Sequence, residues 1–390
     1  MLYVGIDVAK AKHDCCIMDS DGVVHCPNYT FSNSRQGFND FIALVKKCNG
    51  NNLNNVKVGL ESTGHYSHNL IAFLKQSKLY VTVFNPLQVD LYHKAVTLRK
   101  TKTDKCDAKF ICEMLFSDRN KSYQEQSYQI SELKSLSRHR FRLVGYRSKL
   151  KISVTRIFDL VFPELSSVVW SVNQNSVYAL ALELPNTKAI SQCNITRLTN
   201  LLIKTSYGKY RKEKALEIKQ LATSSIGSNS PSLAFELQQT IRLVQNVSSE
   251  IELLEQQIKS LMLEIDSPVM TIPGISFVLG AIIISEIGDI SNFENPSKLL
   301  AFAGCEPSTY QSGKYLANIT PMVKRGSKYL RYALLTATRL VSIKCPVIKN
   351  FLNLKVSQGK HYFVALSHAA RKLVRIIFKL LNTNTAFIAC

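Results

Sequence analysis

The sequence predicts an α/β domain at the N-terminus, a long helical or coiled-coil middle and a mostly α-helical C-terminal domain. Short apolar strand patterns alternate with helical patterns over the first third of the chain. Two long stretches nearly free of glycine and proline follow, each with helical periodicity. The chain ends in an amphipathic pattern, and its 390 residues suffice for two or three domains.

Three strands in a row open the N-terminal domain, and helices and strands alternate after them. Strands are predicted over residues 2–7, 13–18, 23–31, 56–61 and 80–84. Helices are predicted over residues 38–45, 65–75 and 104–116. This order is typical of a ribonuclease-H-like domain, in which the first and fourth strands are neighbours.

Two long helices are expected in the middle, over residues 130–158 and 232–265. The first is rich in arginine and lysine, and the second carries a heptad seam interrupted at Ser248. The two helices could pair within one chain or across a dimer. The polar segment 189–229 between them shows no clear arrangement.

The C-terminal part begins with a compact unit from Pro268 to about Ile343, and a final amphipathic helix follows it. Its first turn, around Pro273 and Gly274, is similar to a helix-hairpin-helix turn. The predicted domains are 1–125 (catalytic), 126–265 (helical linker or coiled coil), 266–345 (C-terminal domain) and 346–390 (C-terminal helical segment).

A net charge of +21, spread over the whole chain, indicates a polyanionic partner such as a nucleic acid. A membrane partner is not expected, because the longest apolar run, 277–284, is far shorter than the roughly 20 residues that span a bilayer. No signal peptide is evident, and the ten cysteines form no CxxC pair. These features predict a cytoplasmic protein with reduced thiols.

Four acidic residues stand at positions suited to metal binding. Asp7 and Glu61 end the first and fourth strands, and Asp104 and Asp107 share one face at the start of a helix. Burying carboxylates where the apolar face of a helix packs on a sheet costs free energy, unless a cation or hydrogen bonds satisfy them. Each acid alone has an ordinary explanation, but together they predict a site for one or two Mg²⁺ ions, with Mn²⁺ as a substitute.

Basic residues accompany the acids, as the approach of a phosphate backbone would require. Those predicted to bind nucleic acid near the acids are Arg99, Lys100 and Lys102. Lys105 and Lys109 are equally consistent with a solvated charged face.

A second group of candidates lies near the C-terminus. Ser312 precedes a glycine, which allows an exposed hydroxyl and close backbone approach, although Ser-Gly pairs are common in turns. A basic helix start follows it, which is a natural phosphate-binding feature. The predicted nucleic-acid contacts in this part are Gly274, Gly313, Lys314, Lys324, Arg325, Lys328 and Arg331.

These motifs, taken in order, resemble the DEDD transposases of bacterial insertion sequences. The N-terminal segments are 4–10 (VGIDVAK), 61–64 (ESTG) and 102–108 (KTDKCDA). The C-terminal segments are 272–275 (IPGI), 285–289 (SEIGD), 302–304 (FAG), Pro307, 312–313 (SG) and 326–331 (GSKYLR). His65 stands where a small residue is more usual in the family.

The resemblance implies a RuvC-like N-terminal domain, similar to Holliday-junction resolvases, that uses Asp7, Glu61, Asp104 and Asp107. It implies that Ser312 attacks DNA and forms a phosphoserine link. It further implies a noncoding RNA encoded by the element, which pairs with donor and target DNA, and assembly as dimers and tetramers. In such assemblies the acids of one chain would join the serine of another.

Three other functions fit parts of the pattern. A junction-resolving endonuclease would need the acids but not Ser312. A sugar kinase or actin-like ATPase would have a glycine in the turn after Asp7, which the segment 7–10 lacks. A non-catalytic nucleic-acid-binding protein would explain the charge but not the carboxylates.

Overall fold

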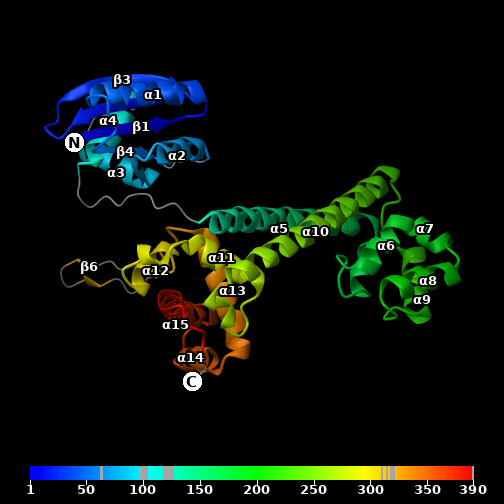
Figure 1. The fold of residues 1–390 in the computed structure, drawn as a ribbon. Helices are drawn as coiled ribbons and strands as arrows, with labels where there is room; N and C mark the ends of the chain where they lie inside the picture. The colour runs from blue at the N-terminus through cyan, green and yellow to red at the C-terminus, as the bar shows by residue number, and fades with distance from the viewer. Residues whose placement is uncertain are drawn as a thin grey trace. The chain divides into compact units, whose positions relative to one another are not determined.

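In the computed structural model the chain forms two compact units, residues 1–125 and 126–390 (Figure 1). The structure describes residues 1–61, 65–96, 104–116, 127–308, 311–312, 315–316 and 321–388. Within these ranges, the side chains of residues 104–105, 311–312 and 315–316 are outside the description.

The N-terminal unit is built on a five-stranded mixed sheet. Its strands are β1 (Leu2–Val8), β2 (Lys12–Asp19), β3 (Val24–Ser32), β4 (Val56–Glu61) and β5 (Tyr80–Phe84). The strand order is β3-β2-β1-β4-β5. β1 is antiparallel to β2 and parallel to β4, so the prediction that the first and fourth strands are neighbours is confirmed.

Helices cover both faces of this sheet because successive strand residues point to opposite sides. Val4 and Ile6 of β1 share a core with α1 (Arg35–Cys48) and α2 (Ser67–Gln76). Tyr3 of β1 packs in a second core with α3 (Pro86–Val96) and α4 (Asp104–Met114). The helices predicted over 38–45, 65–75 and 104–116 are confirmed, whereas α3 was not predicted.

Two long helices form the frame of the second unit (Figure 1). α5 (Tyr128–Val161) and α10 (Pro231–Ile265) pack along one another within the chain. Ion pairs cross between them: Nε of Arg140 lies 2.7 Å from Glu255 Oε1, and Nη2 of Arg156 lies 2.6 Å from Glu236 Oε1. The structure therefore pairs the predicted helices within one chain.

The segment between these helices folds around a core of its own. It contains η1 (Pro163–Ser167), α6 (Asn175–Glu183), α7 (Thr187–Gln192), α8 (Ile195–Thr205) and α9 (Lys212–Ser224). Leu180, Leu198 and Ile218 are buried there against Phe158 of α5 and Ile241 of α10. Asn186 and Asn194 cap the starts of α7 and α8 through their side chains.

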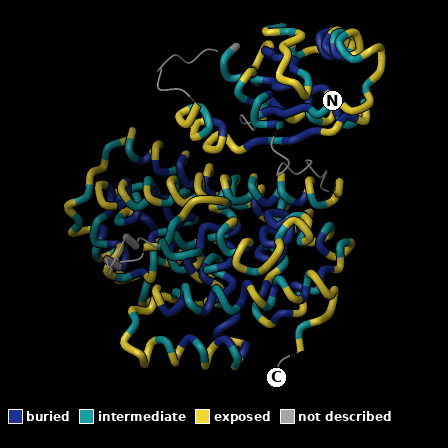
Figure 2. The backbone as a smooth tube through the Cα atoms, turned by 90° about the vertical axis from the view of Figure 1, so that its left-hand side faces the viewer, coloured by how far each residue is buried: buried dark blue, intermediate teal, exposed yellow. Residues whose placement is uncertain are grey.

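The rest of the described chain is mostly helical around a separate core. Figure 2 shows buried residues in dark blue and exposed residues in yellow along the backbone. α11 (Phe277–Ile287) is buried on every side, and α15 (Tyr362–Thr383) buries the apolar stripe that the sequence predicted. The remaining elements are η2 (Pro268–Thr271), η3 (Ile290–Asn292), α12 (Pro296–Phe302), β6 (Gln311–Ser312), β7 (Tyr315–Leu316), α13 (Lys328–Lys344) and α14 (Pro346–Ser357). The predicted boundaries at 265 and 345 remain predictions. Across the described ranges, no helix combines the length and apolar character needed to cross a membrane.

Candidate functional site

Asp7 and Glu61 lie at the same end of two adjacent parallel strands. β1 and β4 pair from Leu2 with Val56 to Ile6 with Leu60, so Asp7 and Glu61 are the next residues on each strand. Both are half-buried. By the strand alternation they belong to the face that α4 covers, opposite the face of Ile6 and Leu60.

Gly5 allows α4 to lie directly against β1. A Cβ atom added at Gly5 would stand 2.1 Å from the Ala108 carbonyl oxygen and 2.3 Å from the Cys112 nitrogen. Farther along α4, the Cys112 thiol donates to the Tyr3 carbonyl at 3.3 Å. α4 therefore runs antiparallel to β1, and its first turn, with Asp104 and Asp107, is at the Asp7 end of the strand.

The ends of β1 and β4 and the start of α4 therefore lie at one edge of the N-terminal unit. Together these three elements carry four acidic residues there. The donor set, oxygen atoms of carboxylates, is the one that Mg²⁺ and Mn²⁺ prefer, so the residues fit such an ion. Asp107 is half-buried. Among the described side chains, which do not include that of Asp104, no three acidic, histidine or cysteine groups come together closely enough to hold a metal.

A fifth acid at this edge was not among the predicted site residues. Asp14 of β2 pairs directly with Asp7 across the antiparallel ladder and is 5% exposed. The Thr30 hydroxyl donates a hydrogen bond to its carboxylate, and Lys12 Nζ lies 3.8 Å from it. The alternation in β2 could have indicated it, because Asp14 precedes Cys16 and Met18 on the face that α4 covers.

The basic residues predicted beside the acids, Arg99, Lys100 and Lys102, lie outside the described residues. Lys109 on α4 forms an ion pair with Glu113 one turn later, at 3.7 Å. This contact supports the reading of Lys109 as part of a solvated helix face.

Ser312 is the last residue of β6, where it pairs with Tyr315 of β7. A short stem leads to this hairpin: Ser308 N donates to Pro321 O at 2.8 Å, and Val323 N donates to Glu306 O at 3.0 Å. A cavity of about 590 Å³ opens beside the stem, lined by both of its sides and by Arg325. Gly313 and Lys314 lie outside the described residues.

The start of α13 presents an exposed basic group. Lys324, Arg325 and Lys328 are exposed, and the Ser327 hydroxyl caps the helix by accepting from Leu330 N at 3.2 Å. Arg331 is different, because its Nη1 donates to the carbonyls of Ala303 and Lys324 at 3.2 and 3.0 Å. Arg331 therefore has a structural role in joining α13 to the stem, whatever it contacts outside the chain.

Gly274 also has a structural role. Its φ is 100°, and an added Cβ would stand 2.9 Å from the Leu340 carbonyl oxygen of α13. The turn before α11 thus needs glycine for close packing as well as for its backbone conformation. A contact between Gly274 and phosphate remains a prediction.

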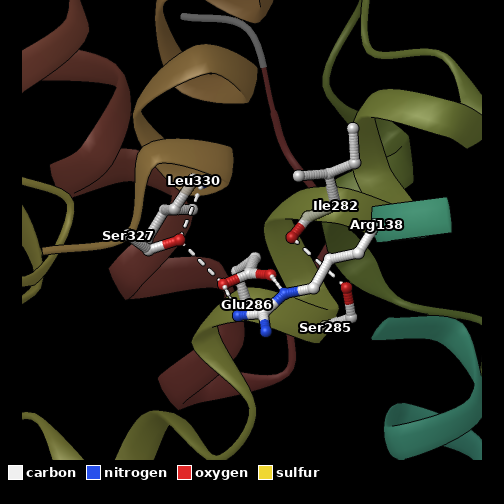
Figure 3. A network of polar contacts seen from close by, with 6 residues as sticks. All are labelled: Arg138, Ile282, Ser285, Glu286, Ser327 and Leu330. Carbon is white, nitrogen blue, oxygen red and sulfur yellow. Dashed lines mark hydrogen bonds and ion pairs between the residues drawn. The ribbon is translucent and has the colours of Figure 1, made fainter. Parts of the chain in front are cut away.

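A polar network around the buried Glu286 carboxylate fixes the capped start of α13 (Figure 3). Arg138 of α5 donates to both carboxylate oxygens of Glu286 on α11, at 2.6 and 3.0 Å. The Ser327 hydroxyl donates to the same carboxylate at 2.7 Å. Glu286 is 2% exposed, so one buried carboxylate links α5, α11 and the α13 cap. The sequence could not indicate this pair, whose members are 148 residues apart.

Two parts of the chain match families of transposases. Residues 4–163 match the DEDD family of IS110-type elements, described as "Transposase", and residues 266–353 match the "Transposase IS116/IS110/IS902 family". The first match contains the predicted acids and the second contains Ser312. These matches identify the class of the protein as transposases.

Comparison with whole proteins defines the group further. The chain is 23% identical over 386 residues to the pilin gene-inverting protein of Moraxella bovis, covering 99% of this chain and 97% of that protein. It is also 23% identical over 403 residues to a 44.8 kDa protein of insertion element IS116 from Streptomyces clavuligerus, covering 99% and 96%. The chain belongs to the IS110/IS116 family of insertion-sequence transposases.

Proposed function

We propose that this transposase cleaves and rejoins DNA through a Ser312 nucleophile, assisted by Mg²⁺ at the acids of a RuvC-like N-terminal domain. The observation that carries the proposal is the convergence of β1, β4 and α4, each with acidic residues, at one edge of the sheet. The presence of Ser312 in the family's C-terminal region supports the second half of the proposal.

Asp7, Glu61, Asp104 and Asp107 would hold the metal, which when bound supplies electrostatic stabilisation of charge on the scissile phosphate. In the proposed step the Ser312 oxygen forms a bond to phosphorus as a P–O bond of the DNA backbone breaks. The serine gives up its hydroxyl proton, and the departing DNA oxygen takes up a proton. The phosphoserine bond conserves the energy of the broken bond, so the reverse step joins strands without ATP.

The proposed partners are DNA and a noncoding RNA encoded by the element, bound by a homodimer or homotetramer in the bacterial cytoplasm, at the nucleoid. The net charge of +21 supports a polyanionic partner. The exposed basic group Lys324, Arg325 and Lys328 follows the serine stem and reaches the first residue of α13, so it could contact DNA phosphates.

A test uses bacteria that express the chain together with its native flanking DNA and a target plasmid. We expect recombinant junctions and SDS-resistant protein–DNA adducts from the parent, and neither product from Ser312→Ala or Asp104→Ala. Three results together would instead identify a metal-dependent endonuclease of the junction-resolving kind. Ser312→Ala would still cut DNA, Asp104→Ala would not, and no sample would contain an adduct.

A further inference from the structure

Two aromatic side chains stand almost fully in solvent on the helical segment between α5 and α10. Trp170, the only tryptophan of the chain, is 95% exposed, and Tyr207 is 89% exposed. Both line one cavity of about 470 Å³, within the usual size of ligand pockets, together with polar residues that include Gln174 and Lys209. Large aromatic surfaces left in water beside a cavity indicate a binding site.

Tyr210 holds the two sides of this cavity together. Its hydroxyl accepts hydrogen bonds from Trp170 N at 3.3 Å and from Gln174 Nε2 at 2.7 Å. Its own backbone nitrogen donates to the Ser206 hydroxyl at 2.8 Å. The loop that carries Trp170 is thereby joined to the turn that carries Tyr207.

Tyr207 occupies a backbone position where glycine is usual. It follows the C-cap Ser206 of α8 with φ 54°, and Gly208 N donates to Ile203 O at 2.9 Å, as in a Schellman turn. A left-handed conformation is unfavourable for a tyrosine. Its presence at this position is explained if its exposed ring has a function, since such unfavourable conformations gather at binding sites.

The surroundings of the cavity are basic. Lys204, Lys209 and Lys212 are exposed, and none of them belongs to an ion pair among the described residues. Of the acids in this segment, Glu183 and Glu217 are paired with Arg197 and Lys214. Glu213 is exposed and, like the three lysines, belongs to no ion pair among the described residues. The aromatic rings are therefore accompanied by cations that are available for an anionic ligand.

We propose that Trp170 and Tyr207 form a stacking site for unpaired bases of a single-stranded nucleic acid, with the three lysines on its phosphates. Aromatic faces joined to a basic groove are how proteins hold single strands, because every base has a face that can stack. The lysines favour a nucleic acid over a protein partner, because lysine is depleted at protein–protein interfaces. The site lies in residues 164–265, which neither family match covers, and it is distinct from the acids and Ser312.

The single tryptophan reports on the site directly. We expect short single-stranded oligonucleotides to quench its fluorescence in a saturable manner in the full-length protein, and a duplex of the same sequence to do so much more weakly. Oligoribonucleotides and oligodeoxyribonucleotides of one sequence distinguish RNA from DNA as the source of the bases. Ser312→Ala and Asp104→Ala should quench like the parent, so this result is independent of the proposed DNA chemistry.

The decisive variant is Tyr207→Gly, which should leave thermal stability unchanged or higher while weakening the single-strand affinity by roughly tenfold. The matched control Phe235→Ala removes an aromatic ring that is 59% exposed outside the cavity and should leave the affinity unchanged. Unquenched fluorescence, or equal affinity of Tyr207→Gly and the parent, would overturn the proposal. A fluorescence change that follows protein concentration instead of oligonucleotide would assign the surface to a protein contact.

Discussion

Glu286 illustrates how much depends on one buried carboxylate. It is 2% exposed and accepts hydrogen bonds from Arg138 and Ser327. The Arg138 side chain is 40% exposed, so water can solvate it when Glu286 is removed, and the cost is smaller than for a fully buried pair. We expect Glu286→Ala to lower the free energy of unfolding by about 2 kcal/mol in urea denaturation, through its lost hydrogen bonds. Glu183→Ala, which breaks the exposed pair with Arg197, should change it by less than about 1 kcal/mol.

The same carboxylate predicts a dependence of stability on pH. Burial favours its protonated form, but the hydrogen bonds and charge of Arg138, with Ser327 and Lys134, outweigh burial and hold the pKa of Glu286 below the ordinary glutamate value. A lowered carboxyl pKa gives stability above the unfolded-state pKa of about 4.3, which is lost as the pH falls through the folded-state pKa.

The excess stability of the parent over Glu286→Gln should therefore be constant near neutral pH and shrink below about pH 4. Urea denaturation of both proteins at a series of pH values measures it. A difference that stays constant, or grows, towards pH 3 would contradict the assigned role of Glu286.

Packing of α4 against the sheet brings the acidic residues together. Substitution of Gly5 tests this packing. In Gly5→Ala the new Cβ would meet the α4 backbone within 2.3 Å, so the helix must move. We expect a loss of about 1–3 kcal/mol in stability, with reduced DNA cleavage even though no acid is changed. Gly145 is an exposed residue of α5, and a Cβ added there meets nothing within 4 Å. Gly145→Ala should therefore stabilise the protein by about 0.5–1 kcal/mol and leave DNA cleavage normal.

Strands and long helices were predictable from sequence because their apolar periodicity is strong. β4 and β5 have the predicted bounds, and α5 and α10 differ by a few residues. α3 was missed because Leu87 and Leu91 are exposed and Val89 is its buried apolar contact, so the pattern is weak. The helices of 175–224 were not predicted, although only α7, with six residues, is much shorter than the helices that were.

The candidate site, too, could be predicted from the sequence only in part. Acids at strand ends are visible in the sequence, because register follows from alternation. Alternation in β2 indicates the face of Asp14, but its pairing with Asp7 is known only from the fold. Glu286 depends on a partner 148 residues away and cannot be recognised before the fold is known.

The charge of the whole molecule predicts how it binds DNA. Each lysine or arginine on a phosphate releases counterions, so the logarithm of the binding constant falls with that of the salt concentration, by about 0.9 per contact on duplex DNA. Lys328→Ala should weaken binding on all sequences and reduce that slope by about 1. Titrations at several salt concentrations measure the slope. An unchanged slope would mean that Lys328 does not contact a DNA phosphate.

The proposed reaction requires a covalent bond between the whole protein and its DNA. The most direct measurement isolates the SDS-resistant adduct, digests it with nuclease and trypsin, and locates the residual nucleotide by mass spectrometry. Our account predicts a nucleotide on Ser312 in the tryptic peptide 299–314, which also contains Ser308, Thr309 and Tyr310. A nucleotide on any of those three residues, or DNA cleavage with no nucleotide on the peptide, would contradict it.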